Sequence, residues 1–217
     1  MIKEYIKQVE KFSSLKPKTI LEIGALDGHY AKVLKTHFRL SEGSTYLVEP
    51  NPDLYLKLKT RYPKAHTFNR ALSDKSVDRL LFNKVVSGRK SEVGCSSLME
   101  RSTGSWNDYI LKKQVKISVQ AITGYSLLKR INKPIDLCIL DVEGMSYQVL
   151  SSFGSKISLL RSVMVECEHT EIFTNQKLFQ DVSDFLFRKK YRMMAFKYSY
   201  ANQSDSIWIQ EKYIKFN

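Results

Sequence analysis

Acidic residues and glycines with a defined spacing occupy two places early in the chain. The first is the segment 19–28 (TILEIGALDG), in which an apolar strand runs into a glycine turn. A second apolar run ends in Glu49, about twenty residues further on. In an open α/β sheet such a turn lets the backbone approach a nucleoside, and the carboxylate after the next strand accepts hydrogen bonds from the ribose hydroxyls. The two segments therefore predict a nucleoside-binding site.

The glycine turn differs from the loops that bind pyrophosphate. Only Gly24 and Gly28 are glycine, no Lys closes the turn, and Glu22 and Asp27 bring negative charge to it. Carboxylates repel a pyrophosphate but attract a cation such as the sulfonium and amine of S-adenosylmethionine. We therefore expect that cofactor. The alternative for the turn alone is an ordinary strand–turn–helix junction, whose glycines serve only positive backbone φ angles.

Short apolar runs alternate with longer amphipathic ones, which predicts βαβ units in one α/β domain spanning 1–217. The expected strands are Thr19–Ile23, Thr45–Val48, His66–Asn69, Ile135–Leu140, Val163–Cys167, Tyr191–Tyr198 and Ser206–Gln210. The expected helices are 1–16, Tyr30–Phe38, one starting at Asn51-Pro52, Ser126–Ile131 and Gln176–Lys189. The last two strands flank a short polar turn at Ala201–Asp205, so they should be antiparallel. The result is a seven-stranded, mostly parallel sheet with an antiparallel last strand.

An insertion of roughly 60 residues separates the third and fourth strands. Its core, 77–122, holds two β-like runs, Val77–Val85 and Val115–Ile122, around the polar stretch Ser87–Asp108. Long loops of this kind in compact domains are usually lids or binding loops. Trp106 and Tyr109 could stack on a sugar or base there, or pack the lid against the body.

Polar side chains concentrate where the strands end, which is where open α/β sheets bind ligands. The polar residues at or just after the ends of the third, fourth and fifth strands are Asn69, Arg70, Asp141, Glu143, Glu166, Glu168 and His169, and Ala71 follows Arg70. Asp141 is a candidate base, with a helix cap as the alternative, and Glu143 has an equal case for capping the helix near Ser146.

A metal site is a further hypothesis. Strand alternation places Glu166 and Glu168 on one face, beside Asp141 if the fourth and fifth strands are neighbours. Together with His169 these oxygens could hold Mg²⁺ or Mn²⁺. The alternative is that the two glutamates pair with nearby Lys or Arg and that His169 merely ends a strand.

Four motifs together resemble the FkbM family of S-adenosylmethionine-dependent methyltransferases. They are the segments 22–28 (EIGALDG), 48–52 (VEPNP), 71–74 (ALSD) and 141–144 (DVEG), the last followed by the helical segment Ser146–Leu150. The likeness extends from about Thr19 to the strand containing Asp205–Trp208. It implies a Rossmann-like class I methyltransferase fold and methylation of sugar or natural-product hydroxyls. One departure is Leu26, where the family usually has Asn.

The resemblance and the strand-end pattern imply roles for individual residues. Asp141 and Glu143 are the expected catalytic residues, and Asp141, Glu166, Glu168 and His169 the candidate metal ligands. The expected cofactor-binding residues are Glu22, Gly24, Ala25, Asp27, Gly28, Glu49, Pro50, Asn69, Arg70, Ala71 and Asp141.

Composition bounds the partners and the compartment. The net charge of +13 suggests an acidic partner such as nucleic acid or an acidic glycan, although a solvated surface explains it equally well. The densest basic run is Arg188–Arg192. The three cysteines, Cys95, Cys138 and Cys167, form no C-x-x-C pair, so we expect free thiols and a reducing, cytoplasmic environment. No apolar stretch reaches the roughly 18 residues of a membrane helix.

Three functions follow in order of preference. The first is O-methylation of a hydroxyl on a sugar, a glycan or a related small molecule. The second is methylation of an RNA ribose 2′-hydroxyl, which the basic charge motivates. The third is a nucleoside-binding or basic scaffold protein without enzyme activity.

Overall fold

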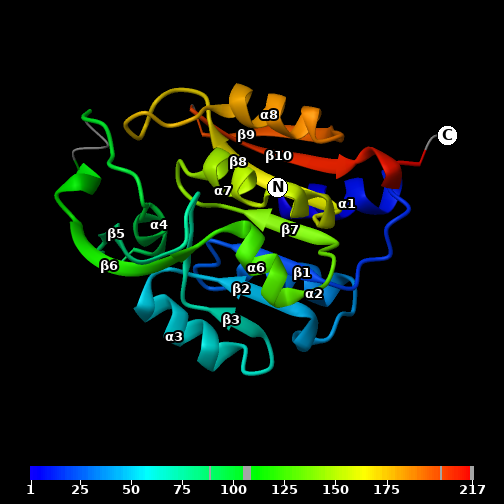
Figure 1. Ribbon diagram of the computed structural model, residues 1–217, viewed down its shortest axis with the longest axis horizontal. Coiled ribbons are helices and arrows are strands. Elements are labelled where there is room, and N and C mark those ends of the chain that lie inside the picture. Colours follow the sequence, from blue (N-terminus) through cyan, green and yellow to red (C-terminus); the bar gives the residue numbers. More distant parts are fainter. Residues whose placement is uncertain (88, 105–108, 201, 216–217) are drawn as a thin grey trace.

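A seven-stranded sheet in the order β3-β2-β1-β7-β8-β10-β9 forms the centre of the protein (Figure 1). The computed structural model describes residues 1–217 except 88, 105–108, 201 and 216–217. The strands are β1 Ile20–Ile23, β2 Thr45–Val48, β3 His66–Phe68, β7 Leu137–Leu140, β8 Ser162–Glu168, β9 Tyr191–Tyr200 and β10 Gln203–Gln210. The first five strands in this order, β3, β2, β1, β7 and β8, pair in parallel, and β10 is antiparallel to both β8 and β9. The predicted α/β fold with a mostly parallel sheet is confirmed.

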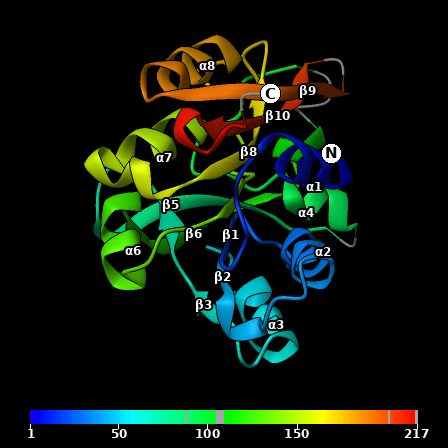
Figure 2. The same cartoon turned by 90° about the vertical axis from the view of Figure 1, so that its right-hand side faces the viewer.

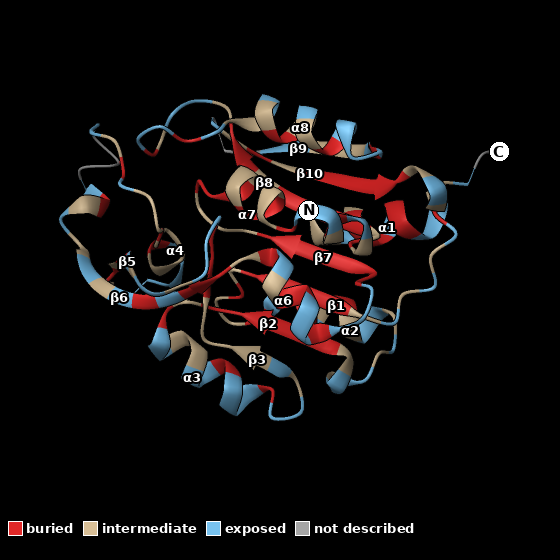
Figure 3. Cartoon of the chain, viewed as in Figure 1, coloured by how far each residue is buried: buried red, intermediate tan, exposed pale blue. Residues whose placement is uncertain are grey.

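Helices cover both faces of this sheet, as Figure 2 shows. Helices α1 Ile2–Phe12, α2 His29–His37 and α3 Pro52–Arg61 pack on one face, and α6 Gly124–Ile131, α7 Ser146–Ser152 and α8 Phe179–Arg188 on the other. Successive residues of β1 serve the two cores in turn, Ile20 in one and Leu21 in the other. Because both faces are covered, the central strands β1 and β7 are buried throughout and appear as a buried layer in Figure 3; Glu22 is the one charged residue within them.

The N-terminal helix is anchored to the sheet by one buried tyrosine. Helix α1 ends at Phe12, short of the predicted residue 16. Its Tyr5 is fully buried, and the hydroxyl lies 2.7 Å from Ser162 Oγ and accepts a hydrogen bond from Cys138 N at 3.2 Å. The helix is therefore attached to two central strands, β7 and β8.

The insertion forms a second, three-stranded sheet in the order β4-β6-β5. It comprises β4 Ala71–Leu72, β5 Val77–Val85 and β6 Gln114–Ile122, and it lies at the carboxyl ends of the central strands (Figure 1). The two long strands agree with the predicted runs. The short helix α4 Lys90–Gly94, within the polar stretch, was not predicted. Trp106 lies outside the described residues.

Several predicted boundaries were wrong. Within the expected turn Ala201–Asp205, residues 203–205 belong to β10, which pairs Asp205 with Glu166, and Ala201 lies outside the described residues. Polar side chains suggested a turn, but they lie where the strand reaches a cavity. Helix α8 begins at Phe179 rather than at Gln176. The Gln176 side chain instead accepts hydrogen bonds from the N–H groups of Ile172 and Phe173, which holds a loop there.

The remaining expectations concern thiols, charge and membranes. Cys138 and Cys167 are buried free thiols, as predicted, and Cys95 is partly exposed. The basic run Arg188–Arg192 forms the turn from α8 into β9, beside the amino end of β8. Within the described ranges, no helix has the length and apolar character needed to cross a bilayer. Short 3₁₀ turns at Glu42–Ser44, Gly154–Leu159 and Glu211–Tyr213 complete the fold.

Candidate active site

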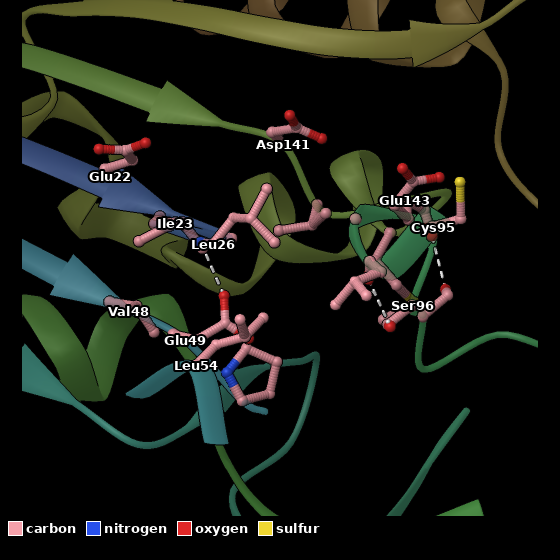
Figure 4. Close-up of a pocket in the computed structure, with 18 of the residues that line it drawn as sticks. Glu22, Ile23, Leu26, Val48, Glu49, Leu54, Cys95, Ser96, Asp141 and Glu143 are labelled. Atoms are coloured by element: carbon pink, nitrogen blue, oxygen red, sulfur yellow. Dashed lines mark hydrogen bonds between the residues drawn. The ribbon is translucent and has the colours of Figure 1, made fainter. Parts of the chain in front are cut away.

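The order of the strands reverses between β1 and β7, and a cavity of about 610 Å³ opens beside their carboxyl ends. This volume is within the range typical of small-molecule sites. Figure 4 shows Glu22, Glu49, Asp141 and Glu143 from three strand ends around this cavity, with Cys95 and Ser96 of the insertion on its far side. The predicted strand-end residues are therefore largely brought together.

Gly24 allows the loops after β1 and β7 to touch. Its φ is +76°, and a Cβ atom there would lie 1.7 Å from the backbone oxygen of Asp141. No side chain fits in that space. The glycine turn is thus needed for packing the Asp141 loop, in addition to any approach of a ligand.

Glu49 is held in the cavity wall by the backbone. Its carboxylate accepts hydrogen bonds from Leu26 N at 2.9 Å and Asn51 N at 2.8 Å, and only 5% of the residue is exposed. Burial raises the pKa of Glu49 to about 7, against the lowering effect of these hydrogen bonds. The fixed carboxylate still has free lone pairs that could accept from the two hydroxyls of a ribose.

Glu22 links the first strand to the following helix. Its carboxylate accepts a hydrogen bond from Ala31 N at 2.8 Å, in the first turn of α2. The N-cap of that helix is Gly28, which has no side chain to offer, so Glu22 supplies the missing acceptor. Burial raises the pKa of Glu22 to about 8.

Three carboxylates gather on the opposite wall. Oxygens of Asp141, Glu143 and Glu166 all lie within 4.8 Å of one another. Burial and then the neighbouring Asp205 and Glu168 raise the pKa of Asp141 to about 7. The pKa values of Glu143 and Glu166 are also raised, first by burial and then by the neighbouring acids. The wall is thus strongly suited to a positively charged ligand.

The turn after β7 is held in a strained conformation by the insertion. Glu143 has φ of +46°, and Gly144 follows with φ of +85°. Ser97 Oγ donates to Glu143 O at 2.6 Å, and Arg101 Nη2 lies 3.8 Å from Glu143 Oε2. Such strain at a cavity is typical of functional sites.

The insertion also contacts the glycine turn. Lys90 Nζ of α4 lies 2.6 Å from Asp27 Oδ2. Partial burial opposes a low pKa at Asp27, but Lys90 and Arg61 outweigh it and lower that pKa. Leu26 has φ of +48°, a conformation that Asn tolerates better than Leu. Its side chain lies under Gly94, so the departure from the family's Asn coincides with a contact to α4.

Four predicted site residues do not line the cavity: Gly28, Asn69, Glu168 and His169. Gly28 packs against Tyr62, and Asn69 donates to the backbone oxygens of Glu49 and Pro50 and so supports their loop. Glu168 accepts a hydrogen bond from Gln176.

His169 also lies away from the cavity. It contacts Ser204 at 2.8 Å and packs among Phe179, Phe196 and Tyr198. Among the described residues, Glu143 rather than Glu168 and His169 completes the acidic group with Asp141 and Glu166.

Other predicted residues do line the cavity, and so do some that the sequence did not identify. Ala25, Asp27, Pro50, Arg70 and Ala71 are in its wall as expected. Missed residues include Tyr30, Leu54, Phe82, Val142, Met145 and Gln203, together with Lys90, Ser91 and Val93–Leu98 of the insertion. The polar stretch of the insertion was the only available signal for the second group. Gln203 had been assigned to a turn.

Comparison with solved structures defines the class of fold. A crystal structure of an FkbM methyltransferase from Methylobacillus flagellatus aligns with a TM-score of 0.57 and 9% identity, over 89% of this chain and 44% of that one. A magnesium protoporphyrin IX methyltransferase from Synechocystis aligns with a TM-score of 0.51 and 10% identity, over 96% and 77% of the two chains. The fold is therefore that of Rossmann-like class I methyltransferases.

The family follows from the sequence comparison. The family model described as the methyltransferase FkbM domain matches residues 22–193. The chain thus belongs to the FkbM family of S-adenosylmethionine-dependent methyltransferases. No curated protein matches the sequence. The chain spans less than half the length of the Methylobacillus protein.

The contact at Gly24 predicts the cost of a side chain there. We expect Gly24→Ala to lower the free energy of unfolding by at least about 3 kcal/mol, because the backbone must move away from Asp141 and an L-residue disfavours this φ. Gly43→Ala is the matched control, since its nearest neighbour is 3.8 Å away, and it should change stability by less than about 0.5 kcal/mol. Chemical denaturation measures both. Equal stabilities of the two variants would contradict the close contact between Gly24 and the backbone of Asp141.

The raised pKa values predict how stability depends on pH. Glu22, Glu49 and Asp141 have folded pKa values of about 8, 7 and 7, above the ordinary values of 4.5 and 3.8. Between the ordinary and the raised pKa values, the folded state therefore binds more protons than the unfolded state. The free energy of unfolding consequently decreases as the pH rises through this range.

We expect the melting temperature of the ligand-free protein to fall by roughly 5 °C or more from about pH 5 to about pH 8. The double variant Glu22→Gln/Asp141→Asn should show a flatter profile, whereas exposed Asp184→Asn should keep the wild-type slope. A melting temperature that rises with pH in the wild type would show that these acids are not protonated in the fold.

Proposed function

We propose that the protein transfers the methyl group of S-adenosylmethionine to a hydroxyl oxygen of a sugar or glycan. The observation that supports this most is the single cavity that joins Glu49, the glycine turn and Asp141. These three parts match what the cofactor needs. Glu49 is a hydrogen-bond acceptor for its ribose, the glycine turn leaves room for its methionine end, and Asp141 places negative charge beside its sulfonium.

The residues of the cavity fit the cofactor. Glu49 would accept hydrogen bonds from the ribose hydroxyls, and charged acceptors make such bonds strong. Glu22 and Gly24 would face the methionine end, and Arg70, Ala71 and Leu72 would border the adenine. Bound there, S-adenosylmethionine supplies an electrophilic methyl carbon on a sulfur that leaves as a neutral thioether. Asn69 would act indirectly, through the loop that it supports.

Asp141 is the proposed base. It would orient the acceptor hydroxyl and take its proton while the oxygen forms the new bond to the methyl carbon and the carbon–sulfur bond breaks. A pKa of about 7, raised by burial and neighbouring acids, suits a base near neutral pH. Glu143 and Glu166 would keep the surroundings negative, which stabilises positive charge on the donor.

The acidic wall disfavours the alternative RNA acceptor. A ribose 2′-hydroxyl lies next to a phosphate, and that phosphate would meet three carboxylates around Asp141. A sugar hydroxyl without an adjacent anion avoids this repulsion. The third hypothesis, a scaffold without activity, is favoured only if no acceptor pool takes up a methyl group.

A divalent cation is a second candidate for the acidic wall. Asp141, Glu143 and Glu166 offer oxygens at compatible separations, and oxygen ligands suit Mg²⁺ and Mn²⁺. Such an ion would sit where the acceptor hydroxyl is expected, and the chelator test below decides whether one is required.

Removing the proposed ribose acceptor should weaken cofactor binding. We expect Glu49→Ala to lower affinity for S-adenosylhomocysteine at least tenfold, because hydrogen bonds to a buried carboxylate are lost. The affinity of Glu49→Gln should lie between those of wild type and Glu49→Ala, since an amide oxygen can still accept a hydrogen bond. Titration calorimetry measures the three, with exposed Asp184→Ala as the control for charge. An affinity in Glu49→Ala equal to that of wild type would remove the ribose assignment.

The acceptor class can be identified by transfer of a labelled methyl group. We expect label from S-adenosylmethionine in a pool of oligosaccharides rather than in RNA or small metabolites. Asp141→Asn should reduce transfer about a hundredfold or more while S-adenosylhomocysteine still binds, because the base is lost and the cavity is kept. The same assay with EDTA tests the metal: loss of transfer that Mg²⁺ or Mn²⁺ restores would place an ion at the acidic wall. Label in RNA alone would overturn the sugar assignment.

A further inference from the structure

Helices α1 and α2 lie side by side on one face of the sheet (Figure 2). Residues of both helices line a second groove. Its volume is about 910 Å³. Ile6 and Val33 form the apolar part of its lining, and charged side chains make up most of the rest. Neither the cofactor nor the proposed base uses this groove.

The groove is lined by a row of lysines. Lys3, Lys7 and Lys11 are four residues apart on α1, so they share one face of the helix and span about 12 Å. Lys32 of α2 lies across from them, and all four residues are exposed. The aliphatic stems of these lysines therefore contribute to the apolar wall of the groove, and their ammonium groups flank it along its length.

Few acids oppose these lysines. Glu10 is the acid in the lining, and its carboxylate lies 2.7 Å from His37 Nε2. Glu4, outside the lining, lies 3.9 Å from Lys7 Nζ. Exposed pairs of this kind are weak, so the lysines remain available to an anionic ligand.

The groove and the catalytic cavity meet at one residue. His29 lines both of them, and the adjacent Tyr30 lines the catalytic cavity. Helix α2 begins at His29, directly after the glycine turn, so this end of the groove opens toward the strand ends. An extended ligand could lie along the lysines and reach past Tyr30 to the acidic wall.

We propose that the groove between α1 and α2 binds an acidic oligosaccharide, the part of the acceptor that lies away from the methylated hydroxyl. This inference rests on the proposed transfer to a sugar hydroxyl and narrows it to glycans that carry carboxylate, sulfate or phosphate groups. The acceptor would present an uncharged sugar to Asp141 and its negative charges to Lys3, Lys7, Lys11 and Lys32.

The distribution of charge favours this occupant over RNA. The groove is basic, whereas the cavity that it joins holds Asp141, Glu143 and Glu166. A polymer with a phosphate beside every sugar would be attracted at one end and repelled at the other. An oligosaccharide with spaced charges matches both ends. The distribution of charge between the groove and the cavity therefore favours the oligosaccharide over RNA. The net charge of the chain does not distinguish these two polymers.

The test compares two triple variants that remove the same charge from different places. The first is Lys3→Gln/Lys7→Gln/Lys11→Gln in the groove. The second, the matched control, is Arg188→Gln/Lys189→Gln/Lys190→Gln at the amino edge of the sheet. All six positions are exposed, and Gln is unbranched at Cβ like the Lys and Arg that it replaces, so both variants should fold with melting temperatures close to that of wild type.

Titration calorimetry of the full chain, saturated with S-adenosylhomocysteine, measures binding of a hyaluronan hexasaccharide and an unsulfated chondroitin hexasaccharide, in both of which uncharged sugars alternate with sugars that carry a carboxylate. We expect wild type to bind them more weakly as salt rises, and the groove variant to lose at least tenfold in affinity. The control variant should remain within about threefold of wild type. Neutral maltohexaose should bind too weakly to show salt dependence.

Several results would overturn the proposal. These are equal losses in the two variants, no binding of either acidic oligosaccharide by wild type, or tighter binding of a single-stranded RNA or of phosphatidylserine vesicles that depends on the same lysines. The readout is binding, so it is independent of the methyl-transfer assay. Loss of cofactor binding or transfer would remove the proposed function, whereas the two triple variants decide only the groove.

Discussion

The register of three parallel strands determines the site. Ile23 of β1 pairs with Val48 of β2 on one side and with Leu140 of β7 on the other. The next residues along the chain are Gly24, Glu49 and Asp141, so they come together where the strands end. Gly24 permits this because Asp141 O occupies the space that a Cβ would need. A slip of one residue in any of these strands would turn the strand-end side chains toward the opposite face.

The electrostatics of the molecule are divided between its cavity and its surface. The chain carries a net charge of +13, yet the wall opposite Glu49 consists of carboxylates whose pKa values are raised by burial and by one another. Protonation relieves this crowding in the ligand-free protein, and a cationic ligand relieves it in the bound one. Two basic residues, Arg70 and Lys90, line the cavity, whereas Lys3, Lys7, Lys11 and Lys32 lie on the surface of α1 and α2, where they can attract anions without neutralising the acids within.

The insertion completes the cavity from a separate small sheet. Lys90 contacts the glycine turn at Asp27, and Ser97 and Arg101 contact the turn that carries Glu143. These contacts hold Leu26 and Glu143 at positive φ angles. Such angles are unfavourable for L-residues, and interactions within the same segment do not offset their cost in free energy. The strained residues are therefore maintained by tertiary contacts on both sides of the site.

Local patterns in the sequence predicted the strands, their glycine turn and the acids that follow them, because periodicity and turn residues are local properties. Glu49, Gly24 and Asp141 were predicted from such patterns and do line the cavity. Which acids lie together depends on the packing of distant segments: Glu143 joins Asp141 and Glu166 through a left-handed turn, and His169 packs among aromatic rings elsewhere. The same holds for Gln203, for helix α4 and for the groove between α1 and α2. Each depends on contacts between segments far apart in the chain, and the spacing of residues along one segment carries no information about them.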